Sequence, residues 1–298
     1  MNVKAAPYLF CAPFIIGYTV LSLFPILYTF FISLHDWNGI APKVFIGFKN
    51  YISILTQDKL FYKSLVNTIV MMLMAMPFQL LFGLILAQIV FNLKKGRSFF
   101  QITSFLPFIT APVAVGFIFA YLFDWNLGYI NVALKSLGMI NEGVYWLQIP
   151  LASKLVVALM KIWKLTGYCM IIYIAGMTAI SPEIYEAASV DGSSRLNTFI
   201  KITIPMLKHI TLFLFVTSVI SSLQLFDEAA LLYSGWGAAQ SVGGPEYAVL
   251  TVVWKFYDDA FKTNSMLGYG AAESYLLFIT IIAMSLASYR IFNGKEKT

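Results

Sequence analysis

Charged side chains are scarce in this chain of 298 residues, in which only 11% of residues are Asp, Glu, Lys or Arg and 59% are hydrophobic. A soluble globular domain carries about 25% charged residues. A chain this apolar cannot hide its nonpolar surface inside one water-soluble core, so we expect the lipid bilayer to be its solvent. The composition indicates an all-α fold, a polytopic bundle of membrane helices.

Residues that carry enzymatic or metal chemistry are few. The two cysteines, Cys11 and Cys169, both lie in apolar runs, which argues against a disulfide and against a metal site. The two histidines, His35 and His209, lie at the ends of expected spans. The sequence contains no H-E-x-x-H zinc motif, no G-x-S-x-G elbow and no P-loop. We therefore expect no catalytic residue, no metal and no ATP site on this chain.

The net charge of +6 does not indicate nucleic-acid binding. Such binding requires a basic patch together with a module that reads the nucleic acid, and the sequence shows neither. In a membrane protein, Lys and Arg instead collect on the cytosolic side and help to fix the orientation.

Long apolar runs dominate the sequence, and a membrane helix needs about 20 mostly apolar residues. Strong charge-free runs and weaker ones together predict six spans, at 5–34, 64–93, 98–123, 165–182, 210–226 and 274–289. The fourth extends backward if Lys161 and Lys164 are tolerated, and the sixth if Glu273 is tolerated. The first run is far longer than the apolar core of a signal peptide, so we expect it to be a retained span.

Six spans place both termini on one side, and the positive charges favour the cytosol. With that orientation, ten Lys and Arg residues fall inside and eight fall outside. The short segment 94–97 holds three of the inside charges, and short loops weigh most in this rule. We therefore expect an N-in/C-in topology.

No linker divides the chain, so residues 1–298 are expected to form a single membrane domain. The loops at 35–63, 124–154 and 227–265 then face outside. Aromatic-rich segments in the first and third, such as Trp254–Tyr257, predict short surface helices there.

The inside loop at 181–209 has the signals of two short helices. Ser181 and Pro182 suit a helix start, and the Asp191-Gly192 pair is a turn signal. A serine then caps the second helix, which Pro205 stops or kinks. One apolar face of that second helix is expected at Leu196, Phe199, Ile200 and Thr203.

This loop resembles a motif of the inner-membrane permease subunits of ABC importers: E-A-A, three residues, G, nine residues, I, one residue, L-P. The only departure here is Ile204 in place of Leu. The matching and neighbouring positions, which the resemblance assigns to docking of an ATPase, are Glu186, Ala187, Ala188, Asp191, Gly192, Ile202 and Pro205.

Shorter matches along nearly the whole chain resemble the sugar-permease branch, on the side of the first of two partner permeases of the maltose or glycerol-3-phosphate type. They are Phe24-Pro25, Ser33–Trp37, Gly47–Tyr51, Asn67-Thr68, Phe105–Pro107, Gly128–Asn131 and Trp163. The resemblance implies a type I transmembrane domain in a prokaryotic cytoplasmic (inner) membrane, surrounded by lipid. It also implies a second homologous permease, two ATPase subunits that bind ATP and magnesium, and an extracytoplasmic solute-binding protein.

Polar residues inside or beside the spans are candidates for contact with a sugar-like solute, because such residues tend to face wet cavities or partner helices. They are Gln79, Lys161, Lys164, Gln224, Asp227, Glu228, Tyr233, Trp236 and Glu273. The alternatives are a helix–helix hydrogen bond for Gln79, snorkelling for both lysines, and a solvated span end for the pair at 227–228. Glu273, where the family usually has an apolar residue, is expected to pair with a lysine or to line the path or the permease interface.

The predicted function is therefore that of a non-enzymatic half-channel driven by ATP hydrolysis on a partner subunit. The alternative is a self-contained transporter driven by an ion gradient, but no clear internal repeat supports it. The sequence leaves the solute open, and also which permease holds the main solute site.

Overall fold

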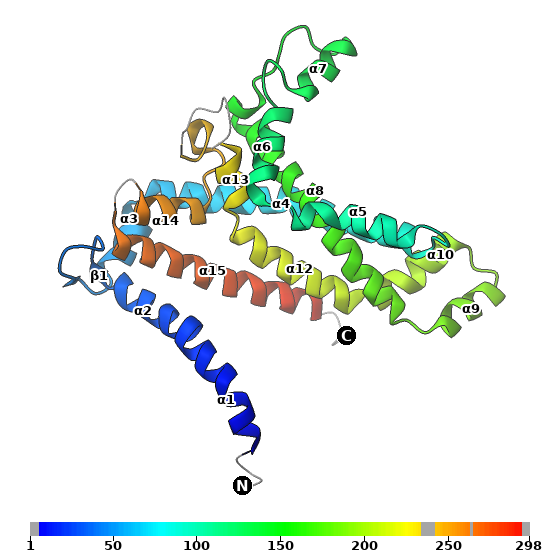
Figure 1. Cartoon of the computed structure of the whole chain (residues 1–298), viewed down its shortest axis with the longest axis horizontal. Helices are drawn as coiled ribbons and strands as arrows, with labels where there is room; N and C mark the ends of the chain where they lie inside the picture. The colour runs from blue at the N-terminus through cyan, green and yellow to red at the C-terminus, as the bar shows by residue number, and fades with distance from the viewer. Residues whose placement is uncertain (1–5, 234–241, 263–264, 294–298) are drawn as a thin grey trace. The chain divides into compact units, whose positions relative to one another are not determined.

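A computed structural model describes residues 6–233, 242–262 and 265–293 of the chain (Figure 1). Helices make up most of this part, and the described strands are two short ones, β1 (His35–Asp36) and β2 (Val44–Phe45), which pair antiparallel. The chain divides into two compact units, residues 1–61 with 255–279 and residues 62–254 with 280–298.

The first unit contains the N-terminal span, the small sheet and one surface helix. Its elements are α1 (Ala6–Tyr18), η1 (Thr19–Leu23), α2 (Phe24–Ser33) and α3 (Lys49–Gln57), with most of α14 (Val252–Phe261) and the first half of α15 (Leu267–Asn293).

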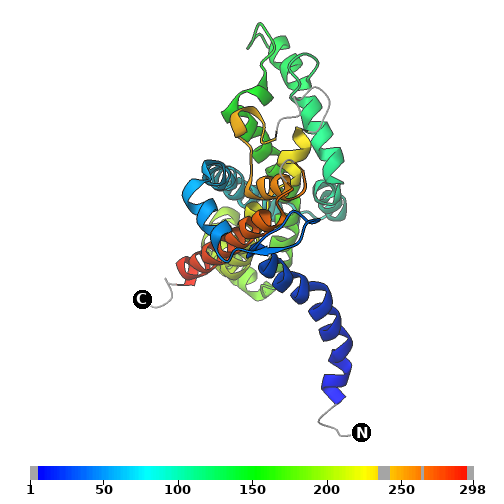
Figure 2. The same ribbon diagram turned by 90° about the vertical axis from the view of Figure 1, so that its left-hand side faces the viewer.

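The N-terminal span is one curved helix in which η1 is a π-helical segment (Figure 2). The amide of Phe24 bonds to the carbonyl of Thr19, five residues earlier. Pro25 follows directly and has no amide hydrogen, so the regular α-helical bonding is interrupted here. The chain nevertheless continues as a helix through both Pro13 and Pro25.

Two of the sequence pieces that resemble the permease family meet at the C-terminal end of α2. The side-chain amide of Asn50 donates to the carbonyls of Ser33 and His35, at 2.9 and 3.1 Å. The hydroxyls of Ser33 and Tyr51 lie 2.6 Å apart. These bonds hold α3 against the end of the span and satisfy the last carbonyl of α2.

The second unit holds the remaining helices. They are α4 (Lys59–Phe91, from Tyr62 onward), α5 (Arg97–Ile109), α6 (Pro112–Leu122), α7 (Tyr129–Ser136), η2 (Trp146–Gln148), α8 (Pro150–Thr178), α9 (Pro182–Val190), α10 (Arg195–Thr198), η3 (Phe199–Thr203), α11 (Ile204–Met206), α12 (Lys208–Leu223), α13 (Asp227–Leu232) and η4 (Pro245–Tyr247), with the first turn of α14 and the end of α15.

Four described helices are long and apolar enough to cross a bilayer as single elements. They are Phe10–Ser33, Lys59–Phe91, Pro150–Thr178 and Leu267–Arg290. The extensions of the fourth and sixth runs through their charged residues are thus confirmed, because α8 includes both lysines and α15 includes Glu273.

The other two predicted spans are bent. The run at 98–123 breaks at Thr110–Ala111, where α5 and α6 meet at 92°. Both residues have extended backbone angles and Pro112 follows them, which explains the break. The fifth run corresponds to α12, which turns by 65° from the segment Arg195–Met206. By length and composition, the described residues therefore hold four candidate spans, and up to six if each bent pair is one span.

Short helices are present in the first and third of the three long loops, as predicted: α3 lies in the first and α14 in the third. The third loop also holds α13, which is largely buried. The middle loop also carries a helix, α7, which the sequence analysis did not anticipate. Asn131 in α7 explains the order of this loop. Its side-chain amide donates to three backbone carbonyls, and its oxygen accepts from the indole of Trp146.

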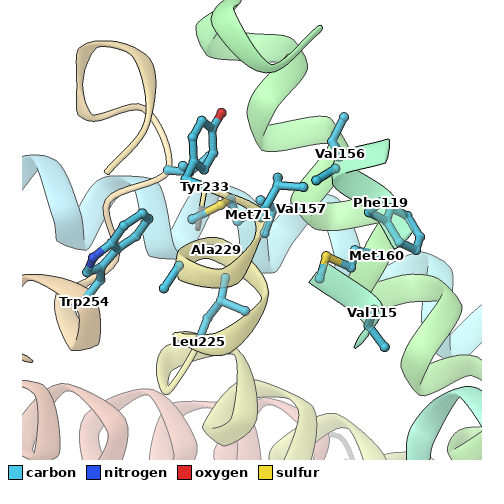
Figure 3. Packing of buried hydrophobic residues seen from close by; sticks show 14 of the residues in the cluster. Met71, Val115, Phe119, Val156, Val157, Met160, Leu225, Ala229, Tyr233 and Trp254 are labelled. Atoms are coloured by element: carbon cyan, nitrogen blue, oxygen red, sulfur yellow. The ribbon is translucent and has the colours of Figure 1, made fainter. Parts of the chain in front are cut away.

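The core of the second unit is a hydrophobic cluster around α13 (Figure 3). Met71 of α4, Phe119 of α6 and Met160 of α8 are buried in it, together with Ala229 and Trp254. Residues from distant parts of the sequence thus fix α13, a helix too short to be stable alone.

Two glycines allow the spans of the second unit to approach closely. A Cβ on Gly167 of α8 would overlap the backbone carbonyl of Ser104 in α5, and a Cβ on Gly83 of α4 would come 2.5 Å from the Cβ of Cys169 in α8. Small residues at such crossings are how membrane helices gain packing energy without a hydrophobic driving force.

Candidate functional site

The loop at 181–209 folds as two short helical segments joined by a tight turn. Pro182 is the first residue of α9, and Gly192 ends it with a left-handed backbone, φ 71°. The amide of Ser193 bonds back to the carbonyl of Ala188 at 2.9 Å, which closes the helix end. The hydroxyl of Ser194 caps the next segment by accepting from the amide of Asn197 at 3.3 Å. Both the turn and the second cap are as predicted, whereas Ser181 makes no side-chain cap.

The surface of α9 combines exposed and buried positions of the E-A-A motif. Glu186, Ala187 and Asp191 are exposed, and Ala188 is buried. No atom lies within 4 Å of the Cβ position of Gly192. The loop therefore presents a small helical surface that is open to a partner.

The four residues predicted to form one apolar face of the second segment differ in exposure. Leu196 and Ile200 are 68% and 53% exposed, whereas Thr203 is buried. The segment contains the π-helical turn η3, in which the amide of Ile204 donates to the carbonyl of Phe199. Ile202 is half-buried, and Pro205 precedes the bend into α12.

Three of the predicted solute-path residues of the second unit bond to other helices. The amide nitrogen of Gln79 in α4 donates to the hydroxyl of Ser218 in α12 at 2.9 Å. The ammonium of Lys161 donates to the carbonyl of Ser221 at 3.1 Å. Lys164 forms an ion pair with Glu228 of α13 at 3.2 Å. The structure thus supports the helix–helix bond for Gln79.

Both lysines of α8 point into the protein, so the snorkelling hypothesis is wrong for them. Lys161 is only 3% exposed. A lysine ammonium at this depth needs a partner, and the carbonyl of Ser221 and the nearby Lys164–Glu228 pair supply it.

The other predicted path residues of this unit differ in their surroundings. Gln224 and Asp227 are exposed near the end of α12. Tyr233 is buried in the hydrophobic cluster, where its hydroxyl lies 2.7 Å from that of Ser153, so packing accounts for its burial. Trp236 lies outside the described residues.

Glu273 is the centre of a charged cluster in the first unit. Its side chain is completely buried, and its oxygen Oε1 lies 2.5 Å from the ammonium of Lys255 in α14. The same ammonium lies 2.7 Å from a carboxylate oxygen of Asp58 and 2.7 Å from one of Asp259. The hydroxyl of Tyr269 donates to Asp58 at 2.8 Å. The predicted pairing of Glu273 with a lysine is confirmed, and α14 is thereby tied to α15.

The three carboxylates of this cluster stand close enough to bind a metal ion. The ammonium of Lys255 already occupies the place of the cation among them, since it bonds to all three. The cluster therefore fits an internal salt-bridge network better than a metal centre.

The charges of the cluster stabilise one another. Burial alone would raise the pKa of Asp58, but hydrogen bonds from Lys255, the Phe61 amide and Tyr269 lower it below its usual value. Burial alone would lower the pKa of Lys255, but the three carboxylates raise it. Both side chains are thus held in their charged forms at neutral pH.

The sequence analysis missed three members of this cluster. Lys255 and Asp259 are four residues apart on one helix, a spacing that signals a pair. Asp58 lies nearly 200 positions away, and nothing in the sequence links it to Lys255.

Residues 50–294 match the family described as "Binding-protein-dependent transport system inner membrane component". Two relatives align along almost the whole chain. The lactose transport system permease protein LacF of Rhizobium radiobacter is 34% identical over 95% of this chain and 92% of its own length. The arabinooligosaccharides transport system permease protein AraP of Bacillus subtilis is 30% identical over 97% of this chain and 88% of its own.

The fold matches a solved structure as well. A chain of a bacterial ABC transporter involved in the import of the acidic polysaccharide alginate superposes with a TM-score of 0.80, at 21% identity, and 97% of this chain and 95% of that chain are covered. A second structure of an alginate transporter, in complex with a pentasaccharide-bound periplasmic protein, gives 0.81 at 20% identity over 98% and 96% of the two chains.

Proposed function

The chain belongs to the inner membrane components of binding-protein-dependent transport systems, and we propose that it forms half of the path by which an ABC importer carries a sugar or oligosaccharide into the cell. Relatives named for lactose and arabinooligosaccharides support this class of solute. As an inner membrane component, it is a multi-pass membrane protein.

The assembly contains a second, homologous permease, two ATPase subunits on the cytosolic side and an extracytoplasmic solute-binding protein. ATP and magnesium bind to the ATPases, and this chain has neither catalytic residues nor a cofactor of its own. Residues 1–298 act as one transmembrane domain with six spans, in which α5 with α6, and α10–α11 with α12, each count as one. Both termini face the cytosol.

The exposed loop at 181–209 is the observation that carries this proposal. Its α9 presents Glu186 and Ala187 to solvent, and the glycine turn at 192 sets the direction of the chain that returns to α12. A small helix of this kind fits a groove on an ATPase, and a rigid turn transmits the motion of that groove to the spans.

Substitutions of Gly192 test whether the loop at 181–209, the docking loop, binds the ATPase. Its positive φ is accessible to Asn but strained for a β-branched residue, and the space around its Cβ is empty. Gly192→Val and Gly192→Asn therefore add side chains of similar size in the same open space and differ in backbone strain. We expect the Val variant to lose most of the ATPase recovered with the purified chain, and the Asn variant to retain it.

Recovery of an ATPase and a second permease with the wild-type chain, together with this difference between variants, supports the importer. Equal recovery with both variants means that the turn does not set docking. Recovery of the chain alone, with uptake that follows an ion gradient and not ATP, means that it is a secondary transporter.

The solute path is proposed to pass the polar contacts of the second unit. Gln79 and Lys161 lie on two different spans, and the Lys164–Glu228 pair links a third element to them. The exposed Gln224 and Asp227 extend this polar surface outward. Substitutions here are expected to change which sugar is carried, whereas loop substitutions change coupling to ATP.

A further inference from the structure

A cavity of about 640 Å³ lies beside the loop at 181–209, the docking loop, and we call it the polar cavity for its charged residues, although apolar side chains such as Met177 and Ile180 line it too. It is lined by the ends of α4, α5 and α8 and by α9 and α10, all in the second unit. Two arginines from separate helices line it, Arg97 at the start of α5 and Arg195 at the start of α10, together with one acidic residue, Glu186. The guanidinium of Arg97 stacks 5.1 Å from the ring centre of Phe91. The cavity is therefore built with an excess of positive charge.

A second, apolar cavity of about 540 Å³ lies further along the same helices. Phe82 and Ile85 of α4, Pro107 of α5, and Leu159 and Trp163 of α8 line it, and they are partly exposed to the surroundings. Apolar side chains exposed at the surface of a membrane protein are suited to contact with hydrocarbon chains.

Helical spacing places the two cavities one after the other along the same faces of α4 and α5, and together we call them the groove. On α4, Ile85 lines the apolar cavity, and Gln88 and Asn92 on the same face line the polar one. On α5, Ser104 lies two turns from Arg97 on one face, a separation of roughly 10 Å. The groove thus runs from two arginines at one end to a nonpolar surface at the other.

We propose that this groove binds an anionic phospholipid of the cytosolic leaflet, with its phosphate between Arg97 and Arg195 and one acyl chain in the apolar cavity. The assignment to that leaflet rests on the proposed orientation. Guanidinium groups pair with phosphate oxygens through two parallel hydrogen bonds, which makes arginine a favourable ligand for this headgroup. Lys94 and Lys95, in the exposed turn before α5, add positive charge beside the entrance.

Because the lipid would lie directly under α9, its binding would hold the docking loop at a fixed height above the spans. The bound lipid is then part of the joint between permease and ATPase. Lipid that only solvates the surface of a membrane protein would not fix the position of this loop.

The test is native mass spectrometry of the purified wild-type complex after exchange into mixed micelles of phosphatidylglycerol and phosphatidylcholine. We expect one phosphatidylglycerol to be retained in preference to phosphatidylcholine. Arg97→Gln and Arg195→Gln each remove charge-assisted hydrogen bonds, so retention should fall roughly tenfold. Arg290→Gln, which removes the same charge near the end of α15, is the matched control and should have no effect.

The apolar part is tested separately. Ile85→Trp fills the groove and should also lower retention, whereas Leu73→Trp, at another exposed position of α4, should not. Thr103 of α5 also lines the apolar cavity, so Thr103→Trp fills the same space from another helix if the Ile85 variant does not fold.

Equal losses in the Arg97 and Arg290 variants would contradict the proposal, because only net charge would then matter. A different pattern would assign the polar cavity to a soluble anion instead. In that pattern, the arginine variants and added inorganic phosphate both lower the retention of phosphatidylglycerol, whereas Ile85→Trp and Thr103→Trp do not change it. An intact complex with its ATPase but no retained phosphatidylglycerol would reject the lipid site and leave the proposed function standing.

Discussion

The ammonium of Lys255 lies 2.5 Å from a carboxylate oxygen of Glu273, a side chain that is completely buried. The second oxygen of Glu273 has no hydrogen-bond partner. The pair joins a surface helix, α14, to the start of a membrane span. Two further carboxylates, Asp58 and Asp259, share the same ammonium.

Removal of Lys255 is predicted to be more damaging than removal of Glu273. Lys255→Met leaves three carboxylates close together in a largely buried site, and loss of one partner of a buried pair costs about 3–5 kcal/mol. Glu273→Gln leaves the lysine paired with Asp58 and Asp259, so its cost should be smaller. Thermal unfolding of the detergent-solubilised chain, followed by tryptophan fluorescence, measures both.

Lys262→Met is the control for this comparison, since it removes an exposed lysine one turn or more from the cluster. A melting temperature for Lys255→Met equal to that of the control would mean that the cluster adds nothing to stability.

The cluster also predicts a pH profile. The pKa of Lys255 is raised, so its stabilisation is complete below the unfolded pKa of 10.5 and is lost as pH rises through the higher folded value. The pKa of Asp58 is lowered, so its stabilisation is complete above 3.8 and is lost as pH falls through the lower folded value. The difference in melting temperature between wild type and Lys255→Met should therefore be largest between about pH 5 and 9 and shrink at both extremes.

The ion pair between Lys164 and Glu228 predicts the result of a charge exchange. Lys164→Glu alone places two carboxylates together and should lower the melting temperature and the rate of sugar uptake. The double variant Lys164→Glu, Glu228→Lys restores the pair in reverse and should recover most of the stability. Uptake that stays low in a stable double variant would mean that the solute itself contacts these charges.

Gly167 predicts a steric effect on helix packing. Because its added Cβ would overlap the carbonyl of Ser104, Gly167→Ala must separate α5 from α8, at a cost of about 1–3 kcal/mol. Gly17→Ala in α1, where no atom lies within 4 Å of the new Cβ, is the control and should be neutral or slightly stabilising. Equal melting temperatures would contradict the close approach.

Local signals in the sequence predicted the long apolar helices, the turn at Gly192 and a cap by Ser193 or Ser194, because each depends on neighbouring residues. They did not predict the 92° break between α5 and α6, although Pro107 and Pro112 stand on either side of it. Prolines occur both in continuous spans, as Pro77 does in α4, and at breaks, and only the packing around them decides which.

The partners of the buried polar side chains could not be predicted from the sequence either. Spacing alone placed Lys161 and Lys164 on adjacent turns, but it gave no indication that Ser221 and Glu228 would meet them. Partners that lie 60 or more residues away depend on how helices cross, and single-sequence periodicity carries no information about crossings.

The N-terminal span, Phe10–Ser33, has none of its apolar window buried within the chain. Its side chains therefore stay accessible even where they contact other helices, as Phe30 contacts the ring of Tyr275, and most of its free energy comes from transfer into lipid. Such a helix does not need the packed interior of the chain in order to form, so its stability should follow the thickness and composition of the surrounding lipid. The π-helical bend at Thr19–Leu23 gives it a place at which its tilt can adjust to a thinner or thicker hydrocarbon layer.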